Sequence, residues 1–297
     1  RPPQRRFDLA GFCLITLGSG GVLLSLNGVE TLSDLLRPAT LLPLLLGAIA
    51  LTLFIRVERQ QAEPLLDLSL FNHHRFRYSV LLASLQSIIL FGCILLIPLW
   101  MQNTLGFSPL TTGLVFLATA LAAAACSPIA GRWIDRAPPQ WCIGLGLIAT
   151  VISLIGLGTL SATTPVWIIA AWMGLRGMGL GFAYLPATTV GMKDLPEQQV
   201  AQASAMNNMA RRLVSSLGVV ALSVYYDMSV RASLELGIAY SEASASALHV
   251  AFFVLAGIAL ACLPLAWVLG RAGVPSDMAM PSSSNSPPQT SLQGRAK

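Results

Sequence analysis

Charged residues are scarce in this chain of 297 residues: they make up 10% of the sequence, where a soluble globular domain has about 25%. Hydrophobic residues account for 55%, and the mean hydropathy is +0.69. This balance excludes an ordinary soluble domain. The formal net charge of +5 is spread along the sequence without a basic patch, so we do not expect nucleic acid as a partner.

The motifs of soluble enzymes and of metal sites are also missing from the sequence. It holds no GxSxG, HExxH or phosphate-binding GxxxxGK[ST] motif, and no hydrophobic segment presents paired carboxylates or a histidine cluster. The three histidines lack ligand spacing, and the five cysteines form no CxxC pair. We therefore expect no metal, no cofactor and no enzymatic activity.

Long uncharged runs dominate the sequence instead. A run of about 18 or more such residues can cross a hydrocarbon core of about 30 Å as a helix. The segments that meet this condition are 9–26, 38–55, 78–101, 110–130, 141–160, 165–192, 203–225 and 247–269. The sequence therefore predicts an all-α, polytopic membrane protein with eight transmembrane helices.

Basic residues indicate how these segments are oriented. With the N-terminus in the cytoplasm, eleven cations lie near cytoplasmic segment ends and only two, Arg37 and Arg231, lie near the opposite ends. The positive-inside rule then places both termini of a multi-pass inner (plasma) membrane protein in the cytoplasm. Residues 226–246 would form an external loop with room for a short interfacial helix. The Ser- and Pro-rich residues 272–297 would form a disordered cytoplasmic tail.

Arg176 lies near the middle of the run 165–192, which holds no other charge. A guanidinium at that depth costs roughly 2.5–3.5 kcal/mol on insertion scales, so it must meet polar partners or a water-filled cavity. Met173 lies one helical turn before it, and Tyr184 two turns after it on a similar face. We interpret the three residues as a wall of a substrate cavity. The alternative is a structural arginine bonded to backbone carbonyls of a neighbouring helix.

Other polar residues inside the hydrophobic runs allow two interpretations each. Gln86, within 78–101, would hydrogen-bond either a ligand or another helix. Asn207 and Asn208 stand with Arg211 and Arg212 at the start of 203–225. These four either line the cytoplasmic mouth of a pathway or are wetted by water at the membrane surface.

Two glycine-containing motifs complete the set of candidate residues. Gly131, Asp135 and Arg136 lie between two segments, where they would form either a latch that gates the cytoplasmic face or an ordinary loop. Gly177 and Gly181 have the small-xxx-small spacing that lets another helix backbone approach closely.

Several stretches together resemble the 14-helix drug:proton antiporters of the major facilitator superfamily, the EmrB/QacA-type exporters. The resemblance covers residues 5 to about 271. The stretches that carry it are Gly131-xxx-Asp135-Arg136, Leu175-Arg176-Gly177-Met178-Gly179-Leu180-Gly181, Pro98-Leu99-Trp100-Met101-Gln102, Leu105-Gly106-Phe107-Ser108-Pro109 with Gly113, Phe7-Asp8-xx-Gly11, and Pro64-Leu65-Leu66-Asp67-Leu68-xx-Phe71.

This resemblance implies three parts for the chain. Residues 1–77 would hold two extra transmembrane helices and a cytoplasmic link, and 78–271 would be the C-terminal six-helix half, built as two inverted three-helix repeats. Residues 272–297 would be the tail. The sequence begins with Arg1 rather than Met, so we expect a piece of a longer polypeptide whose N-terminal six helices are missing here.

The implied activity is secondary active transport. The resemblance predicts proton-coupled efflux of amphipathic or cationic drugs, with the proton gradient as the energy source. The substrate would be a small molecule, and membrane lipid would surround the helices. The protein partners would be the missing six-helix half and, as a further candidate, a periplasmic adaptor protein. All 13 acidic residues lie in loops, the tail or segment ends, so the coupling carboxylates would belong to the missing half. The alternatives are a metabolite or siderophore exporter of the same fold, or a truncated membrane protein that transports nothing.

Overall fold

The computed structural model describes residues 8–26, 29, 31–60, 66–161 and 163–271. In this part of the chain all regular secondary structure is helical, and short turns join the helices. The predicted tail, 272–297, lies outside the described residues. The elements in chain order are α1 (Leu9–Leu26), α2 (Leu32–Leu35), α3 (Pro38–Glu58), η1 (Leu68–Asn72), α4 (His74–Pro98), η2 (Leu99–Thr104), α5 (Pro109–Ile134), α6 (Pro139–Gly158), α7 (Val166–Met192), α8 (Glu197–Glu235) and α9 (Tyr240–Arg271).

Seven helices within the described ranges are long and apolar enough to cross a membrane. They are α3, the continuous pair α4 and η2, and each helix from α5 to α9. The remaining predicted span, 9–26, is also helical, but its apolar part, Gly11–Leu26, is shorter than the others. The polytopic helical fold is therefore confirmed, whereas the count of eight spans stays a prediction.

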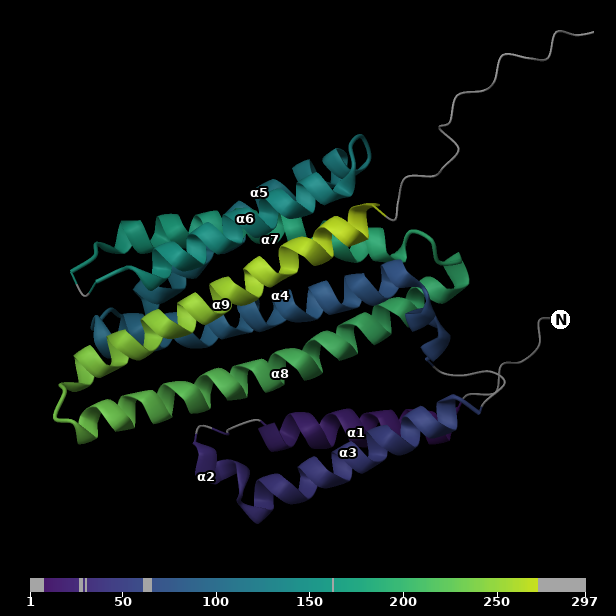
Figure 1. The fold of residues 1–297 in the computed structure, drawn as a ribbon, viewed down its shortest axis with the longest axis horizontal. Coiled ribbons are helices and arrows are strands. Elements are labelled where there is room, and N and C mark those ends of the chain that lie inside the picture. Colours follow the sequence, from purple (N-terminus) through teal and green to yellow (C-terminus); the bar gives the residue numbers. More distant parts are fainter. Residues whose placement is uncertain (1–7, 27–28, 30, 61–65, 162, 272–297) are drawn as a thin grey trace, which may run out of the picture.

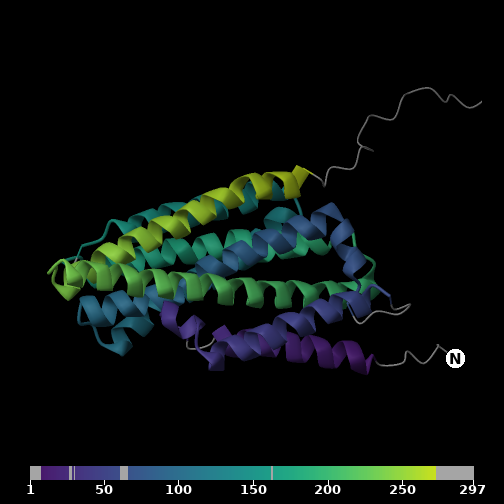
Figure 2. The ribbon, with the colours of Figure 1, turned by 60° about the horizontal axis from the view of Figure 1, so that its bottom comes forward.

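The helices run as long rods in one elongated bundle (Figure 1). Within it α7 packs between α5 and α6, α6 also packs on α9, and α4 contacts α7, α8 and α9. The hairpin of α1 and α3 lies along α8, and the contact between the hairpin and α8 is made mainly through α1. Figure 2, turned by 60°, shows the hairpin still beside α8. The structure thus consists of a six-helix body, α4 to α9, and an attached hairpin.

Apolar side chains cover the outside of these rods. On α3 the exposed residues recur at helical spacing, with Leu42, Leu45 and Leu46 between 57% and 64% exposed. On α5 the exposed face carries Leu110 and Leu121. A water-soluble protein rarely exposes apolar surface on this scale, so lipid is the solvent for these faces.

The linker between α8 and α9 differs from the prediction. The sequence indicates an external loop over 226–246, but α8 continues to Glu235 and α9 begins at Tyr240. At 1.5 Å per residue the 39 residues of α8 span about 58 Å, well beyond the hydrocarbon core. The hydropathy falls after Tyr225, yet an Asp227–Arg231 pair and buried Val230 keep the polar extension helical.

Helix α7 approaches two neighbours closely, because its glycines face both of them. A Cβ atom added at Gly177 would lie 2.2 Å from the Thr119 carbonyl oxygen of α5, and one at Gly181 would lie 2.9 Å from the Cys126 Cβ atom. On the other side, a Cβ atom added at Gly179 would lie 2.7 Å from the Gly146 carbonyl oxygen of α6. Glycine is therefore required where the backbones meet.

We expect Gly177→Ala to destabilise the six-helix body by roughly 1–3 kcal/mol, because the added methyl group meets a backbone carbonyl that cannot turn away. Gly174→Ala is the matched control on the same helix, since nothing lies within 4 Å of its Cβ position. Thermal unfolding of both purified variants in detergent measures the difference. Equal melting temperatures for the two variants would contradict this account of the α5–α7 contact.

Candidate functional site

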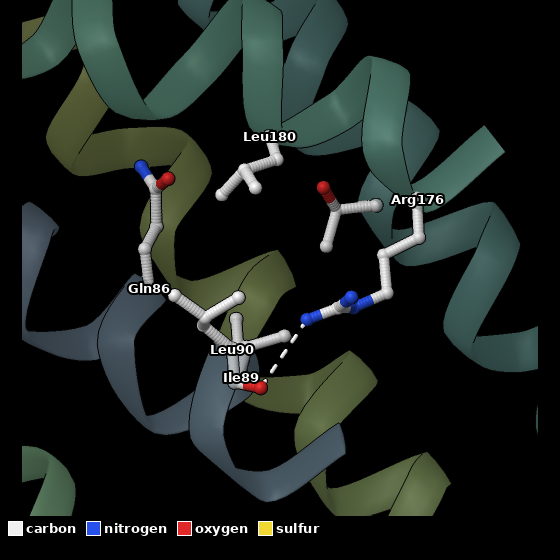
Figure 3. A pocket seen from close by; sticks show the side chains of 6 residues that line it. Gln86, Ile89, Leu90, Arg176 and Leu180 are labelled. Atoms are coloured by element: carbon white, nitrogen blue, oxygen red, sulfur yellow. Dashed lines mark hydrogen bonds between the residues drawn. The ribbon is translucent and has the colours of Figure 1, made fainter. Parts of the chain in front are cut away.

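Arg176 projects from α7 toward α4 and is almost completely buried, with 3% of its surface exposed. Its Nη2 group donates a hydrogen bond of 3.3 Å to the Leu90 carbonyl oxygen of α4 (Figure 3). The Cys93 thiol lies close enough to the guanidinium to interact with it electrostatically. The Nε group is buried and has no partner among the described residues. The structure therefore shows the carbonyl bond of the structural alternative, and it leaves one donor of the guanidinium unused.

A small cavity separates Arg176 from Gln86 of α4. Figure 3 shows the two side chains on opposite sides of this hollow, which Leu180 and Thr150 also line. Gln86 is 7% exposed, and its buried Nε2 group has no partner among the described residues. The volume is about 20 Å³, which admits one water molecule, whereas pockets for drug-sized ligands measure about 300–1,000 Å³. The two polar groups thus face the same hollow, but they do not enclose room for a substrate.

Tyr184, Asn208 and Arg211 form a second polar group, between α7 and α8. The Arg211 guanidinium lies 4.9 Å from the centroid of the Tyr184 ring, a cation–π contact. It also donates a 3.0 Å hydrogen bond to Asn208 Oδ1. The structure therefore separates Tyr184 from Arg176, although both lie on α7.

Two predicted cavity residues lie apart from both groups. Met173 is completely buried in the apolar core, and its carbonyl oxygen accepts a 2.9 Å hydrogen bond from the Thr119 hydroxyl. Asn207 is 5% exposed, and its Oδ1 atom has no partner among the described residues. Neither residue lines the hollow at Arg176. The one-turn spacing of Met173 and Arg176 therefore does not bring their side chains to one cavity in this conformation.

The predicted gating motif lies at the exposed end of α5. Gly131 is inside the helix rather than at its end, because α5 continues to Ile134. Asp135 follows as the C-cap residue, and it and Arg136 are exposed. Within the described ranges neither side chain forms an ion pair or a hydrogen bond. The structure shows no latch at this motif in the conformation that it describes.

An ion pair that the sequence analysis missed does link two helices near the same end of the body. Arg75, in the first turn of α4, binds the Asp194 carboxylate in the turn after α7. The Arg75 side chain is 15% exposed and that of Asp194 is 49% exposed. These residues are 119 positions apart, and no local pattern connects them. Among the described residues, no group of three His, Cys, Asp or Glu side chains could hold a metal ion.

The sequence also matches known proteins in a way that decides its family. A model of the Major Facilitator Superfamily matches residues 8–219, which include both the hairpin and most of the six-helix body. The chain belongs to the major facilitator superfamily. Members of this superfamily are transporters and not enzymes, in agreement with the absence of catalytic motifs from the sequence.

Individual relatives of this major facilitator chain carry transport or resistance names. The chain is 30% identical to the MFS-type transporter YcnB of Bacillus subtilis over 276 residues, 92% of this chain and 57% of YcnB. It is 27% identical to the multidrug resistance protein Stp of Mycobacterium tuberculosis over 232 residues, 78% of this chain and 43% of Stp. It is 32% identical to the methyl viologen resistance protein SmvA of Salmonella typhimurium over 199 residues, 65% of this chain and 39% of SmvA. The chain spans about half the length of the curated relatives it matches.

We expect the Arg75–Asp194 pair to couple α4 to the end of α7 by up to about 1 kcal/mol, since both groups are partly exposed to water. The measurement is a double-mutant cycle with Arg75→Ala, Asp194→Ala and the double variant, followed by thermal unfolding in detergent. The same cycle on Asp227 and Arg231, a pair within α8, should give only about 0.3–0.5 kcal/mol. A coupling near zero at Arg75 would mean that the pair does not hold the helices together.

Proposed function

We propose that this chain is the C-terminal part of a proton-coupled exporter that moves amphipathic or cationic compounds out of the cell across the inner membrane. The observation that carries the proposal is the match of the superfamily model to residues 8–219. Relatives named for multidrug and methyl viologen resistance support export of toxic compounds as the activity. The proton gradient would supply the energy.

The described helices provide one half of such a carrier. In the proposal α4–α6 and α7–α9 are the two three-helix repeats of the C-terminal half, and the α1–α3 hairpin is the pair of extra helices before it. A further six helices, N-terminal to this chain, would form the other half and carry the titratable carboxylates. The partial coverage of the relatives supports this division, because each match leaves a large part of the relative unpaired.

The small volume at Arg176 indicates how the halves would work. A drug-sized ligand reaches Arg176 and Gln86 only if α4 and α7 separate or turn, because their shared hollow admits a single water molecule. Alternating access would supply this movement as one half rocks against the other. The Arg75–Asp194 ion pair would then stabilise one of the two conformations at the cytoplasmic ends of α4 and α7.

The polar side chains have separate roles in this scheme. Arg176 would set the electrostatic potential at the middle of the pathway, with Gln86 beside it as a ligand contact. Tyr184 and Asn208 would lie nearer the cytoplasmic mouth, where Arg211 holds them together. Asp135 and Arg136 would reach partners only in another conformation, because their exposed side chains are unpaired in the described part of this one.

The direct test is dye efflux in everted membrane vesicles that contain the longest reading frame around this chain. We expect ethidium transport that stops when a protonophore collapses the proton gradient, and no transport by the 297-residue chain expressed alone. Transport that continues without the gradient would contradict proton coupling. Transport by the short chain alone would contradict the division into two halves.

A substitution tests the role of Arg176 in the same vesicles. We expect Arg176→Ala to lower kcat/KM for efflux about tenfold, because a charged hydrogen-bond donor at mid-depth is lost. Arg176→Lys should retain part of the activity, and Arg231→Ala, which removes an exposed cation near the end of α8, should retain all of it. Unchanged efflux and an unchanged drug profile in Arg176→Ala would leave the arginine with a structural role only.

A further inference from the structure

A long groove separates the α1–α3 hairpin from the six-helix body. It consists of two hollows, of about 590 and 890 Å³. The smaller hollow lies between α1 and the first half of α8, and the larger one lies between α1, α4 and the second half of α8. Both are lined by Leu23 and Arg212, so they meet at these two residues. The groove is distinct from the small hollow at Arg176.

The walls of this groove are amphipathic. Helix α8 contributes a polar stripe at helical spacing, with Asn208, Arg212, Ser216 and Ser223 on the groove side. The facing walls are apolar, and their side chains are Leu23, Leu24 and Leu26 of α1, Phe91 and Leu95 of α4, and Leu99 of η2. An occupant must therefore offer one long apolar part and one polar group.

The charge in the groove is positive at the junction of the two hollows. Arg212 is exposed there, and its guanidinium has no ion pair or hydrogen bond with any residue that the structure describes. The one carboxylate among the lining residues, Asp227, is already paired with Arg231. Asp227 also lies 15 positions further along α8, about 22 Å from Arg212. The polar group of the occupant should therefore be an anion.

The depth of Arg212 follows from the packing of α8 on α4. The Cβ position of Gly218 contacts Ile88, and the Cβ position of Gly92 contacts Leu222, so the two helices run parallel in this register. Ile88 lies close to the middle of the span 78–101. Arg212 precedes Gly218 by six residues and therefore lies about 9 Å toward the start of α8. From there a long arginine side chain reaches the level of lipid phosphates.

We propose that this groove binds a phospholipid of the cytoplasmic leaflet. Its phosphate is held by Arg212, where charge-assisted hydrogen bonds to an anion are strong. Its glycerol region lies beside Ser19 in the smaller hollow, and an acyl chain extends along Leu23 and Leu95 in the larger one. Basic pockets between transmembrane helices on the cytoplasmic side are suited to such headgroups.

This lipid has a structural consequence. The hairpin reaches the six-helix body mainly through α1 on α8, and the groove leaves much of α1 unsupported. Neither water nor a void suits apolar walls at this depth, whereas an acyl chain provides the missing van der Waals contacts. The phospholipid therefore attaches the hairpin to the body, and its binding does not depend on whether the carrier transports drugs.

The experiment is native mass spectrometry of the purified 297-residue chain in detergent, titrated with phosphatidylglycerol or with diacylglycerol of the same acyl chains. We expect one bound phosphatidylglycerol and clearly weaker binding of diacylglycerol, which lacks the phosphate. Arg212→Gln should weaken phosphatidylglycerol binding about five- to tenfold, and Arg212→Lys should restore most of it. Arg59→Gln, an exposed cation outside the groove, is the matched control and should bind as the wild type does.

A second variant tests the position of the acyl chain. Nothing lies within 4 Å of a Cβ atom added at Gly20, and this residue lines the larger hollow. Gly20→Phe should therefore fill the groove and weaken phosphatidylglycerol binding without lowering the melting temperature in detergent. Binding that neither Arg212→Gln nor Gly20→Phe weakens would overturn the proposal. Equal binding of diacylglycerol and phosphatidylglycerol would also overturn it, because the phosphate would then have no part.

Discussion

The six-helix body depends on close contact between helix backbones, because lipid offers no hydrophobic force that would drive helices together. Helix α7 makes this contact on two sides, through Gly177 to α5 and through Gly179 to α6. Side-chain hydroxyl groups reinforce both contacts: Thr119 of α5 donates to the Met173 carbonyl, and Ser153 of α6 donates to the Trp172 carbonyl. Because α5 and α6 hold α7 on two sides, the side that faces α4 remains to carry functional side chains.

The contact of α7 with α4 is made differently. Ser79 of α4 donates a hydrogen bond to the Ala187 carbonyl near one end, and Arg176 donates one to the Leu90 carbonyl near mid-depth. Between these bonds the buried Nε2 group of Gln86 has no partner among the described residues. A polar group without a partner at this depth is costly, so this contact is held less firmly than those to α5 and α6. If α7 moves relative to its neighbours, we therefore expect the movement to occur at its contact with α4.

Much of the fold could be predicted from the sequence, because hydropathy and helix length determine where a chain crosses lipid. The runs 38–55 and 165–192 agree with α3 and α7 to within a few residues. The prediction of a loop was wrong for most of 226–246, because α8 continues to Glu235 although the sequence turns polar after Tyr225. Hydropathy measures the preference for lipid and carries no information about helix formation in water. Buried Val230 and the hydroxyl contact between Tyr226 and Ser244 show that this extension is held by tertiary packing.

The candidate site was predictable only in part, since single residues can be recognised in a sequence but their neighbours cannot. Arg176 and Gln86 are conspicuous as polar residues in apolar runs, and the structure places them on opposite sides of one hollow. Their partners follow from how the helices rotate on each other. The Leu90 carbonyl, the Asp194 carboxylate and the Tyr184 ring become partners of arginines only through that packing. A single sequence contains no pattern that would indicate these pairs.

The arginines at membrane depth place a condition on what the described helices can bind. Arg176 is buried and bonded to a carbonyl, which accepts the hydrogen bond without cancelling the charge. Arg212 is exposed in the groove between α1 and α8, where we propose that it holds a phosphate. The one carboxylate among the residues that line this groove, Asp227, is already paired with Arg231. A cationic compound would be repelled by the charge of these helices alone, so the proposed export of cations would require carboxylates from outside these residues that outweigh Arg176. An anionic or neutral amphiphile has no such requirement. In the proposed two-half carrier, the sign of the charge that the other half contributes at the level of Arg176 would therefore determine which class of compound is exported.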